Sequence, residues 1–298
     1  MQLLRTLVLA TALSGVVSNA WAECPRADPA AINLANEGDK ARATNLDEAI
    51  ELYVEASRLA PSNVLILWKL ATAYQKNEAW ADVASTLVMA TKLAPDHANY
   101  FVLMGYAQTK LTRWADAKAS FEQAAKLDPN DADPQFELAT VLLRLGDDQG
   151  ALAHYTRAIQ LEPDDLTLYA PLVDLYVRLG FSEHAERTAK EGLTWGTGAA
   201  TFPLHSLLGV VRERRGDWSG AVASYEAAKL ACGACNERGQ QVAFFNLGAA
   251  YASAKPPRKA EALVNLSTFN KMICRGAAAA RYAEECTQTQ ELIRRVGP

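Results

Sequence analysis

The chain has 298 residues, of which 50% are hydrophobic, and a formal net charge of -4 at pH 7. A chain of this length and composition can bury a large core. Its small acidic excess gives no indication of nucleic-acid binding, which is usually accompanied by a basic excess.

The first 22 residues have the pattern of a bacterial secretory signal. A single charge, Arg5, precedes the largely apolar run 7–17, and the segment ends in the small-residue sequence Ala20-Trp21-Ala22. We expect cleavage after Ala22, so that Glu23 begins the mature chain. An uncleaved membrane anchor is the alternative, but the apolar run is short for a bilayer span. The pattern predicts a periplasmic or secreted protein without an integral membrane span, in a compartment that favours disulfides.

After a lead-in of residues 23–28, a regular period governs the chain. Within residues 98–131, two apolar patterns with helical spacing are separated by a break at 111–113, which predicts a pair of helices. Pro129 follows the second helix and cannot continue it. The same landmarks return every 34 residues, as Pro61, Pro95, Pro129 and Pro163, and as Ala56, Ala90, Ala124 and Ala158.

A helix-turn-helix period of 34 residues that ends in proline resembles the tetratricopeptide repeat family. Residue 98 is position 1 of its repeat in this comparison. The family expects a small residue at position 20, where the chain has Ala49, Val83, Ala117, Ala151, Ala185, Ala221 and Ala260. It expects an aromatic residue at position 24, where the chain has Tyr53, Leu87, Phe121, Tyr155, Ala189, Tyr225 and Val264. The chain departs from the family in having no Trp at position 4, and position 8 is glycine only at Gly105, Gly209 and Gly248.

The resemblance implies an all-α, right-handed solenoid of about seven helix pairs over residues 29–275, with a capping helix over 276–298. The predicted pairs are 29–42 with 46–59, 64–76 with 80–93, 99–110 with 113–127, 133–145 with 149–161, 166–179 with 182–194, 202–215 with 218–231, and 241–253 with 258–272. Gly146, Gly180 and Gly216 lie where turns between helices need a left-handed residue. The fifth repeat, 166–201, is the weakest, because Ala189 replaces a bulky residue and Gly192 a small one. We expect looser packing or a kink after it.

A row of cations is the main candidate for binding. The first helices of such repeats line a concave groove, and position 13 of these helices reads Arg42, Lys76, Lys110, Arg144, Arg178 and Arg214. Aromatic residues at neighbouring positions are Trp68, Tyr106, Phe136 and Phe245. Together they suit a protein or peptide segment, extended or helical, that is held by its carboxylates. The alternative is that the cations are solvated and only stabilise the carboxyl ends of their helices.

The cysteines allow several readings. Cys232 and Cys235 form a CxxC motif, which suits a redox pair, half of a metal site or a structural disulfide. A zinc site needs two further ligands, and no second CxxC or paired histidines follow. No strand-helix pattern surrounds the motif, so a structural disulfide is favoured. Cys274 and Cys286 flank the turn into the last helix, and a bridge between them would pin this helix to the seventh repeat. Cys24 is left without an assigned partner.

No sequence motif indicates catalysis, a cofactor or a metal. Trp80, Trp114 and Trp218 share position 17 and are expected to pack between helices rather than bind a ligand. The chain is therefore expected to be an exported scaffold, and not an enzyme, that binds a protein during assembly of a cell-envelope complex. Two alternatives remain: a thiol-disulfide redox protein that uses residues 232–235, and a tetratricopeptide-repeat protein that self-assembles.

Overall fold

The computed structural model describes residues 28–297, and every regular element within this range is helical. Fourteen helices form seven antiparallel pairs, and α15 (Ala283–Val296) follows them. The predicted all-α solenoid of seven pairs and a C-terminal helix is confirmed. The pairs are α1 (Pro29–Ala41) with α2 (Leu46–Leu59), α3 (Val64–Lys76) with α4 (Trp80–Leu93), α5 (Ala98–Lys110) with α6 (Trp114–Leu127), α7 (Ala132–Leu145) with α8 (Asp148–Leu161), α9 (Tyr169–Arg178) with α10 (Ser182–Gly192), α11 (Phe202–Arg214) with α12 (Trp218–Cys232), and α13 (Val242–Ser253) with α14 (Lys259–Phe269).

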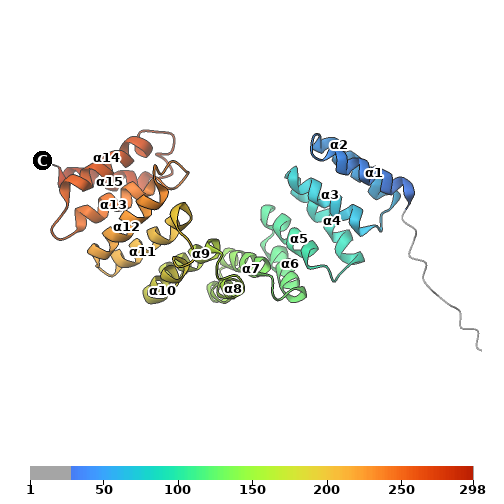
Figure 1. Cartoon of the computed structure of the whole chain (residues 1–298), viewed down its shortest axis with the longest axis horizontal. Coiled ribbons are helices and arrows are strands. Elements are labelled where there is room, and N and C mark those ends of the chain that lie inside the picture. Colours follow the sequence, from blue (N-terminus) through green and yellow to red (C-terminus); the bar gives the residue numbers. More distant parts are fainter. Residues whose placement is uncertain (1–27, 298) are drawn as a thin grey trace, which may run out of the picture.

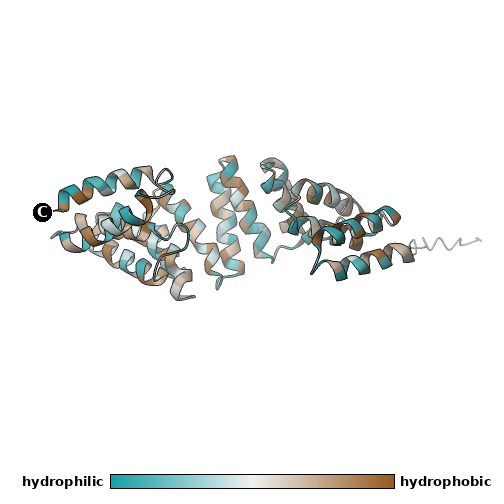
Figure 2. Cartoon of the chain, turned by 90° about the horizontal axis from the view of Figure 1, so that it is seen from above, coloured by the Kyte–Doolittle hydropathy of each residue, from teal (hydrophilic) through white to brown (hydrophobic). Residues whose placement is uncertain are grey.

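The pairs are arranged as an arch. Each pair packs against the next along the chain, so that helices distant in sequence do not meet. In the middle of the arch α5, α7 and α9 lie on the inner side and α6, α8 and α10 on the outer side (Figure 1). Seen from above, most helices carry both hydrophilic and hydrophobic stripes (Figure 2), as expected for helices that bury one face. We call the surface formed by the first helix of each pair the inner face.

Short polar side chains begin several helices. Asn45 accepts a hydrogen bond from the amide of Glu48 at 3.3 Å, and its own amide donates to the Glu48 carboxylate at 3.1 Å. Asp147 accepts from the amide of Gly150 at 2.9 Å. These contacts satisfy amides that have no partner within their helix. Helix capping of this kind gives acidic residues such as Asp147 a structural role that requires no part in catalysis.

In four of the described pairs a glycine of the first helix faces a large side chain of the second. Gly105 on α5 faces Phe121 on α6, and Gly209 on α11 faces Tyr225 on α12. A Cβ atom on either glycine would lie within 2.7 Å of the ring. Both rings are buried. Close approach of the two helices therefore depends on the absence of a side chain at these glycines.

The fifth repeat, whose sequence departs furthest from the family pattern, keeps a continuous core. It reverses the usual sizes, because Val173 stands at position 8 and Ala189 at position 24, and both are fully buried. Tyr169, also fully buried, fills the space next to Gly192. One cluster of buried side chains runs from Ala117 to Val211 without interruption. The volume missing at position 24 is thus supplied by the first helix of the pair.

The register predicted for the seventh repeat was wrong by two residues. Ala262 and Leu266 are fully buried, whereas Val264, predicted at an inward position, is 64% exposed. Gly248 faces Leu266 in the way that Gly105 faces Phe121. The physical reason is the turn, since residues 254–258 separate α13 from α14 while only 111–113 separate α5 from α6.

The C-terminal helix begins later than predicted. A π-helical turn, Asn270–Cys274, continues α14, and residues 275–282 then reverse the chain before α15 begins at Ala283. Cys286 and Val296 on α15 are buried against the end of the array. The predicted boundary at 276 counted this reversal as helix. The predicted signal, the lead-in up to residue 27 and Cys24 lie outside the described residues.

The turns within the pairs need one residue in the left-handed region. Gly146, Gly180 and Gly216 adopt φ values of 81°, 80° and 75° there, as predicted. The same position in earlier repeats holds Glu78 and Thr112, with φ of 55° and 57°. A β-branched residue in this conformation is strained.

Thr112→Gly is therefore expected to raise the free energy of unfolding by about 0.5–1 kcal/mol. Relief of roughly 1–2 kcal/mol of strain exceeds the cost of about 0.5–1 kcal/mol for the more flexible backbone. Chemical denaturation measures the change. Ala119→Gly, at an exposed position inside α6, is the control and is expected to lower stability by about 1 kcal/mol. A less stable Thr112→Gly variant would contradict the interpretation.

Candidate functional site

Four aromatic side chains of the inner face are half-buried. Each packs part of its ring against a core aromatic residue. The distances between ring centroids are 5.2 Å for Trp68 and Tyr100, 5.6 Å for Tyr106 and Phe121, 5.3 Å for Phe136 and Tyr155, and 5.5 Å for Phe245 and Phe269. These contacts fix the ring orientations. All four are residues predicted from the sequence, and they come from α3, α5, α7 and α13.

Carboxylates also lie on the inner face, which the sequence analysis did not anticipate. Asp39 on α1 accepts from the hydroxyl of Tyr53 at 2.7 Å and pairs with Lys69 on α3. Burial raises the pKa of Asp39, but the hydrogen bonds from Lys69 and Tyr53 outweigh it, and the pKa is lowered. This pair joins the first two repeats.

Glu137 on α7 is the second inner carboxylate and lies beside Tyr106 on α5. Burial raises the pKa of Glu137, and nearby Asp133 adds to the effect, while the Tyr106 hydroxyl and Lys110 oppose it. Burial and the charge of Glu137 also raise the pKa of Tyr106. The Asp39–Lys69 and Tyr106–Glu137 contacts are equivalent, because Asp39 follows Gly38 as Tyr106 follows Gly105, and Lys69 and Glu137 are both at position 6 of the next repeat. A charge pattern at these two positions could have revealed them.

The predicted cations lie at one edge of the inner face, because position 13 is in the last turn of each first helix. All six are exposed. Lys110 lies over the ring of Trp80 at 5.6 Å, and Arg144 lies over the ring of Trp114 at 5.7 Å. In each case the tryptophan belongs to the preceding repeat. Such a contact contributes about 0.5–1 kcal/mol at an exposed site.

The other cations differ in their surroundings. Arg178 pairs with Asp174 at 3.2 Å, and Arg214 donates to the carbonyl of Val177 in the preceding repeat. Arg42 is displaced by one residue from the register of the rest, because Gly38 precedes Tyr53 by 15 residues whereas Gly105 precedes Phe121 by 16. The structure therefore brings five of the six predicted cations to equivalent places.

The structure pairs the cysteines as the sequence analysis favoured. Cys232 and Cys235 have Cα atoms 4.8 Å apart, and Cys274 and Cys286 have Cα atoms 5.5 Å apart, with sulfur atoms at bonding distance in both pairs. Cys232 is the last residue of α12, and its sulfur lies 3.5 Å from the carbonyl oxygen of Lys229. Cys235 is fully buried.

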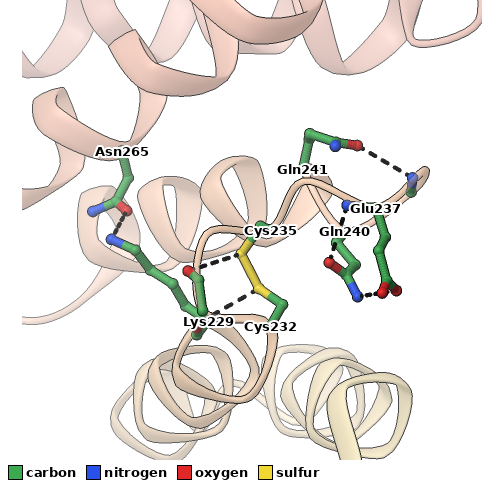
Figure 3. The surroundings of a disulfide bond; sticks show 9 residues. Lys229, Cys232, Cys235, Glu237, Gln240, Gln241 and Asn265 are labelled. Carbon is green, nitrogen blue, oxygen red and sulfur yellow. Dashed lines mark hydrogen bonds between the residues drawn. A yellow bond between two sulfur atoms is a disulfide. The ribbon is translucent and has the colours of Figure 1, made fainter. Parts of the chain in front are cut away.

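The surroundings of the CxxC motif do not favour a reactive thiolate. Figure 3 shows Lys229 extended away from the sulfur atoms, and its ammonium donates to Asn265 at 2.9 Å. The carboxyl end of a helix carries negative partial charge, which disfavours a thiolate at Cys232. Redox-active CxxC motifs place the attacking cysteine at a helix amino end or beside a cation. The geometry is that of a disulfide that closes the short loop after α12.

No group of three or more potential metal ligands occurs within residues 28–297. His154 bonds to Gln135 at 2.8 Å, and His184 packs on Tyr176 with ring centroids 5.4 Å apart. Within the same range, none of the helices has the length and apolarity that a bilayer span requires.

Residues 102–165 match the family model of the tetratricopeptide repeat. This part of the chain belongs to the tetratricopeptide repeat family. The seven helix pairs, with glycine or alanine facing a large residue in most of them, extend the repeat geometry beyond the matched residues. A comparison with curated proteins gives no significant match.

Solved structures with the same fold include a MamA protein, which is 23% identical, with a TM-score of 0.54 over 56% of this chain and 91% of that one. A structure of Pseudomonas aeruginosa pilF is 16% identical, with a TM-score of 0.54 over 68% of this chain and 91% of that one. MamA of Desulfovibrio magneticus RS-1 is 16% identical, with a TM-score of 0.53 over 57% of this chain and 96% of that one. At these identities the likeness concerns the fold of the tetratricopeptide-repeat array alone.

Proposed function

We propose that this tetratricopeptide-repeat protein is an exported scaffold, not an enzyme, that binds a protein or peptide segment on its inner face during assembly of a cell-envelope complex. The observation that carries the proposal is the combination of half-buried aromatic rings along the inner face with a row of exposed cations at its edge. Trp68, Tyr106 and Phe136 offer apolar contact that is already held in place, so binding costs little ordering of these side chains.

The positions of the charges suggest how a guest would lie. Lys69 is already paired with Asp39, and Glu137 is an acidic group near the middle of the face. The cations with room for a new partner are at the edge, where Lys76, Lys110 and Arg144 are exposed. A guest would therefore place apolar side chains on the aromatic rings and carboxylates toward this edge. Charge-assisted hydrogen bonds to such carboxylates contribute about 1.5–3 kcal/mol each when they are shielded from water.

Export is supported by the secretory pattern of residues 1–22 and by two cysteine pairs at bonding distance, which persist in an oxidising compartment. We expect the mature protein, purified from the periplasm or medium of a bacterial host, to begin at Glu23. Intact-mass measurement tests this expectation. A chain that keeps residues 1–22 and stays with the membrane would contradict it.

The triple variant Lys110→Glu, Arg144→Glu and Arg178→Glu is expected to lose capture of protein partners from envelope extract. Three reversed charges at the edge remove the contacts to guest carboxylates and repel them, so affinity should fall roughly tenfold or more. Quantitative mass spectrometry of captured proteins measures the loss. Circular dichroism should show unchanged helicity, with a slightly lower melting temperature because two contacts with tryptophan are lost.

The matched control reverses three exposed cations of second helices, Lys92, Lys126 and Arg157, which lie on α4, α6 and α8. It makes the same change in net charge on the outer side of the arch. We expect this control to capture as much as the wild type. Equal losses in both variants would mean that net charge alone governs capture, and undiminished capture by the edge variant would remove the cations from the proposal.

A further inference from the structure

Tryptophan at position 17 has a recurrent partner in this array. Trp80 and Trp114 begin the second helices of the second and third repeats, and each is covered by the position-13 cation of the following repeat, Lys110 or Arg144. The chain thus shows twice what kind of group this surface holds. The rings are half-buried on the core side, so only the outward part of each is available to the cation.

Trp218 is the third tryptophan at position 17, and it has no such cover. The position-13 residue of the following repeat is Ser253, which stands five residues after Gly248 as Lys110 stands five after Gly105. The longer turn 254–258 follows Ser253 and borders the surface next to Trp218. Among residues 28–297, no cation lies over the ring of Trp218.

A cleft lies beside Trp218, where the seventh repeat has Ser253 instead of a position-13 cation. It has a volume of about 490 Å³ and is lined by Trp218 and Asp217 from one repeat and by Lys255, Pro256 and Arg258 from the next. Asp217 is the N-cap of α12: one oxygen of its carboxylate accepts from the amide of Gly220 at 2.9 Å, and the carboxylate places a negative charge at the edge of the cleft. An aromatic ring beside a carboxylate attracts a cation by both its quadrupole and its neighbour's charge.

The cations that line the cleft do not fill it. Arg258 is held by Glu261 at 3.0 Å and by Glu226 at 3.1 Å, and it lies over the ring of Tyr251 at 4.2 Å. Its charge is therefore matched within its own surroundings. Lys255 is exposed on the turn.

We propose that the Trp218 cleft receives a lysine or arginine side chain presented by a polypeptide partner. The incoming cation would take the position over Trp218 that Lys110 and Arg144 take over their tryptophans, with Asp217 beside it. The cleft is at the turn edge between the sixth and seventh repeats, remote from the central part of the inner face. The inference therefore stands independently of binding on the inner face.

The test uses mature protein labelled with 5-fluorotryptophan, in which the Trp218 resonance is assigned by Trp218→Phe. The probe is the blocked tripeptide acetyl-Gly-Arg-Gly-amide, and its control is the same peptide with citrulline, which has a similar shape without charge. We expect a saturable shift of the Trp218 resonance with the arginine peptide and a response at least about fivefold weaker with the citrulline peptide. The resonances of Trp80 and Trp114 should not respond.

Two reciprocal variants sharpen the test, with circular dichroism to confirm that each is folded. Ser253→Arg supplies the missing cation from within the chain and should abolish the Trp218 response. Lys110→Ser uncovers Trp80 and should add a response there. Three results would each overturn the proposal. They are no shift of the Trp218 resonance with the arginine peptide, an equal shift with the citrulline peptide, and a response to the arginine peptide that persists in Ser253→Arg.

Discussion

Gly209→Val is expected to destabilise the sixth repeat by about 3 kcal/mol, and a second substitution, Tyr225→Ala, is expected to recover much of that loss. A Cβ atom on Gly209 would lie 2.3 Å from the ring of Tyr225, which is fully buried and has no room to move. Overpacking of this kind costs roughly 1–3 kcal/mol and sometimes more. Tyr225→Ala alone leaves a cavity and is expected to cost about 3–5 kcal/mol.

The double variant should lose less stability than the sum of the two single losses, because the fifth repeat already has this combination of residues. Val173 and Ala189 occupy the same two positions there, and both are fully buried in a continuous core. We expect a favourable coupling of about 2 kcal/mol or more between the two substitutions, measured as a double-mutant cycle by chemical denaturation. The Tyr225 hydroxyl donates to Glu213 at 2.9 Å, and that bond is not recovered in the double variant.

The same cycle at Gly105 and Phe121 is an internal replicate, because a Cβ atom on Gly105 would lie 2.7 Å from the ring of Phe121, which carries no hydroxyl. Unfolding of a repeat array need not be two-state, so hydrogen exchange of the affected repeat should accompany the denaturation curves. If the stability losses were additive in both repeats, a larger residue at the first position would not compensate for a smaller one at the second.

The sequence predicted the fold because a 34-residue period is a long-range signal that survives local departures. Boundaries of α3 and α4 agree with the prediction since no insertion changes the turn between them. The period no longer predicts the register of the second helix where the turn within a pair changes length. The seventh repeat contains Pro256 and Pro257, which break helices and indicate a longer turn between α13 and α14. Searching for a large residue to face Gly248 would have found Leu266.

The candidate site was predicted in part. Position within the repeat identified Trp68, Tyr106 and Phe136, because periodicity alone decides which helix face they share. It did not identify the contacts of Lys110 with Trp80 or of Asp39 with Lys69, since these depend on how two successive repeats are placed against each other. The sequence carried both partners of each contact, but not the geometry that joins them.

Removal of the Cys274–Cys286 pair is expected to detach the C-terminal helix from the array. The two cysteines are separated by 12 residues, and closing a loop of this size restricts the unfolded chain by about 3 kcal/mol in the chain-entropy account. Cys274→Ala with Cys286→Ala avoids placing a polar group at Cys286, which is buried beside Phe269 and Ile273. Hydrogen exchange should show lost protection in α15 and unchanged protection in α1 to α8, because each repeat contacts only its neighbours.

The Cys232→Ala and Cys235→Ala variant is the matched control, and it also separates a structural role from redox chemistry. Its cysteines are separated by only 3 residues, so the chain-entropy account gives about 2 kcal/mol. Its effect should stay in the loop that follows α12, leaving α15 protected. A reductant should reproduce the loss at α15 in the wild type and add nothing in the Cys274→Ala and Cys286→Ala variant.

Insulin reduction by the wild type that disappears in the Cys232→Ala and Cys235→Ala variant would instead assign a redox role to the motif. We expect no such activity. Cys232 ends α12, where carbonyl oxygens converge, and Cys235 is fully buried behind it. The ammonium of Lys229, three residues before Cys232, donates to Asn265 at 2.9 Å and extends away from the sulfur atoms (Figure 3). A thiolate formed at Cys232 would therefore lack the stabilisation that makes a CxxC cysteine an effective nucleophile.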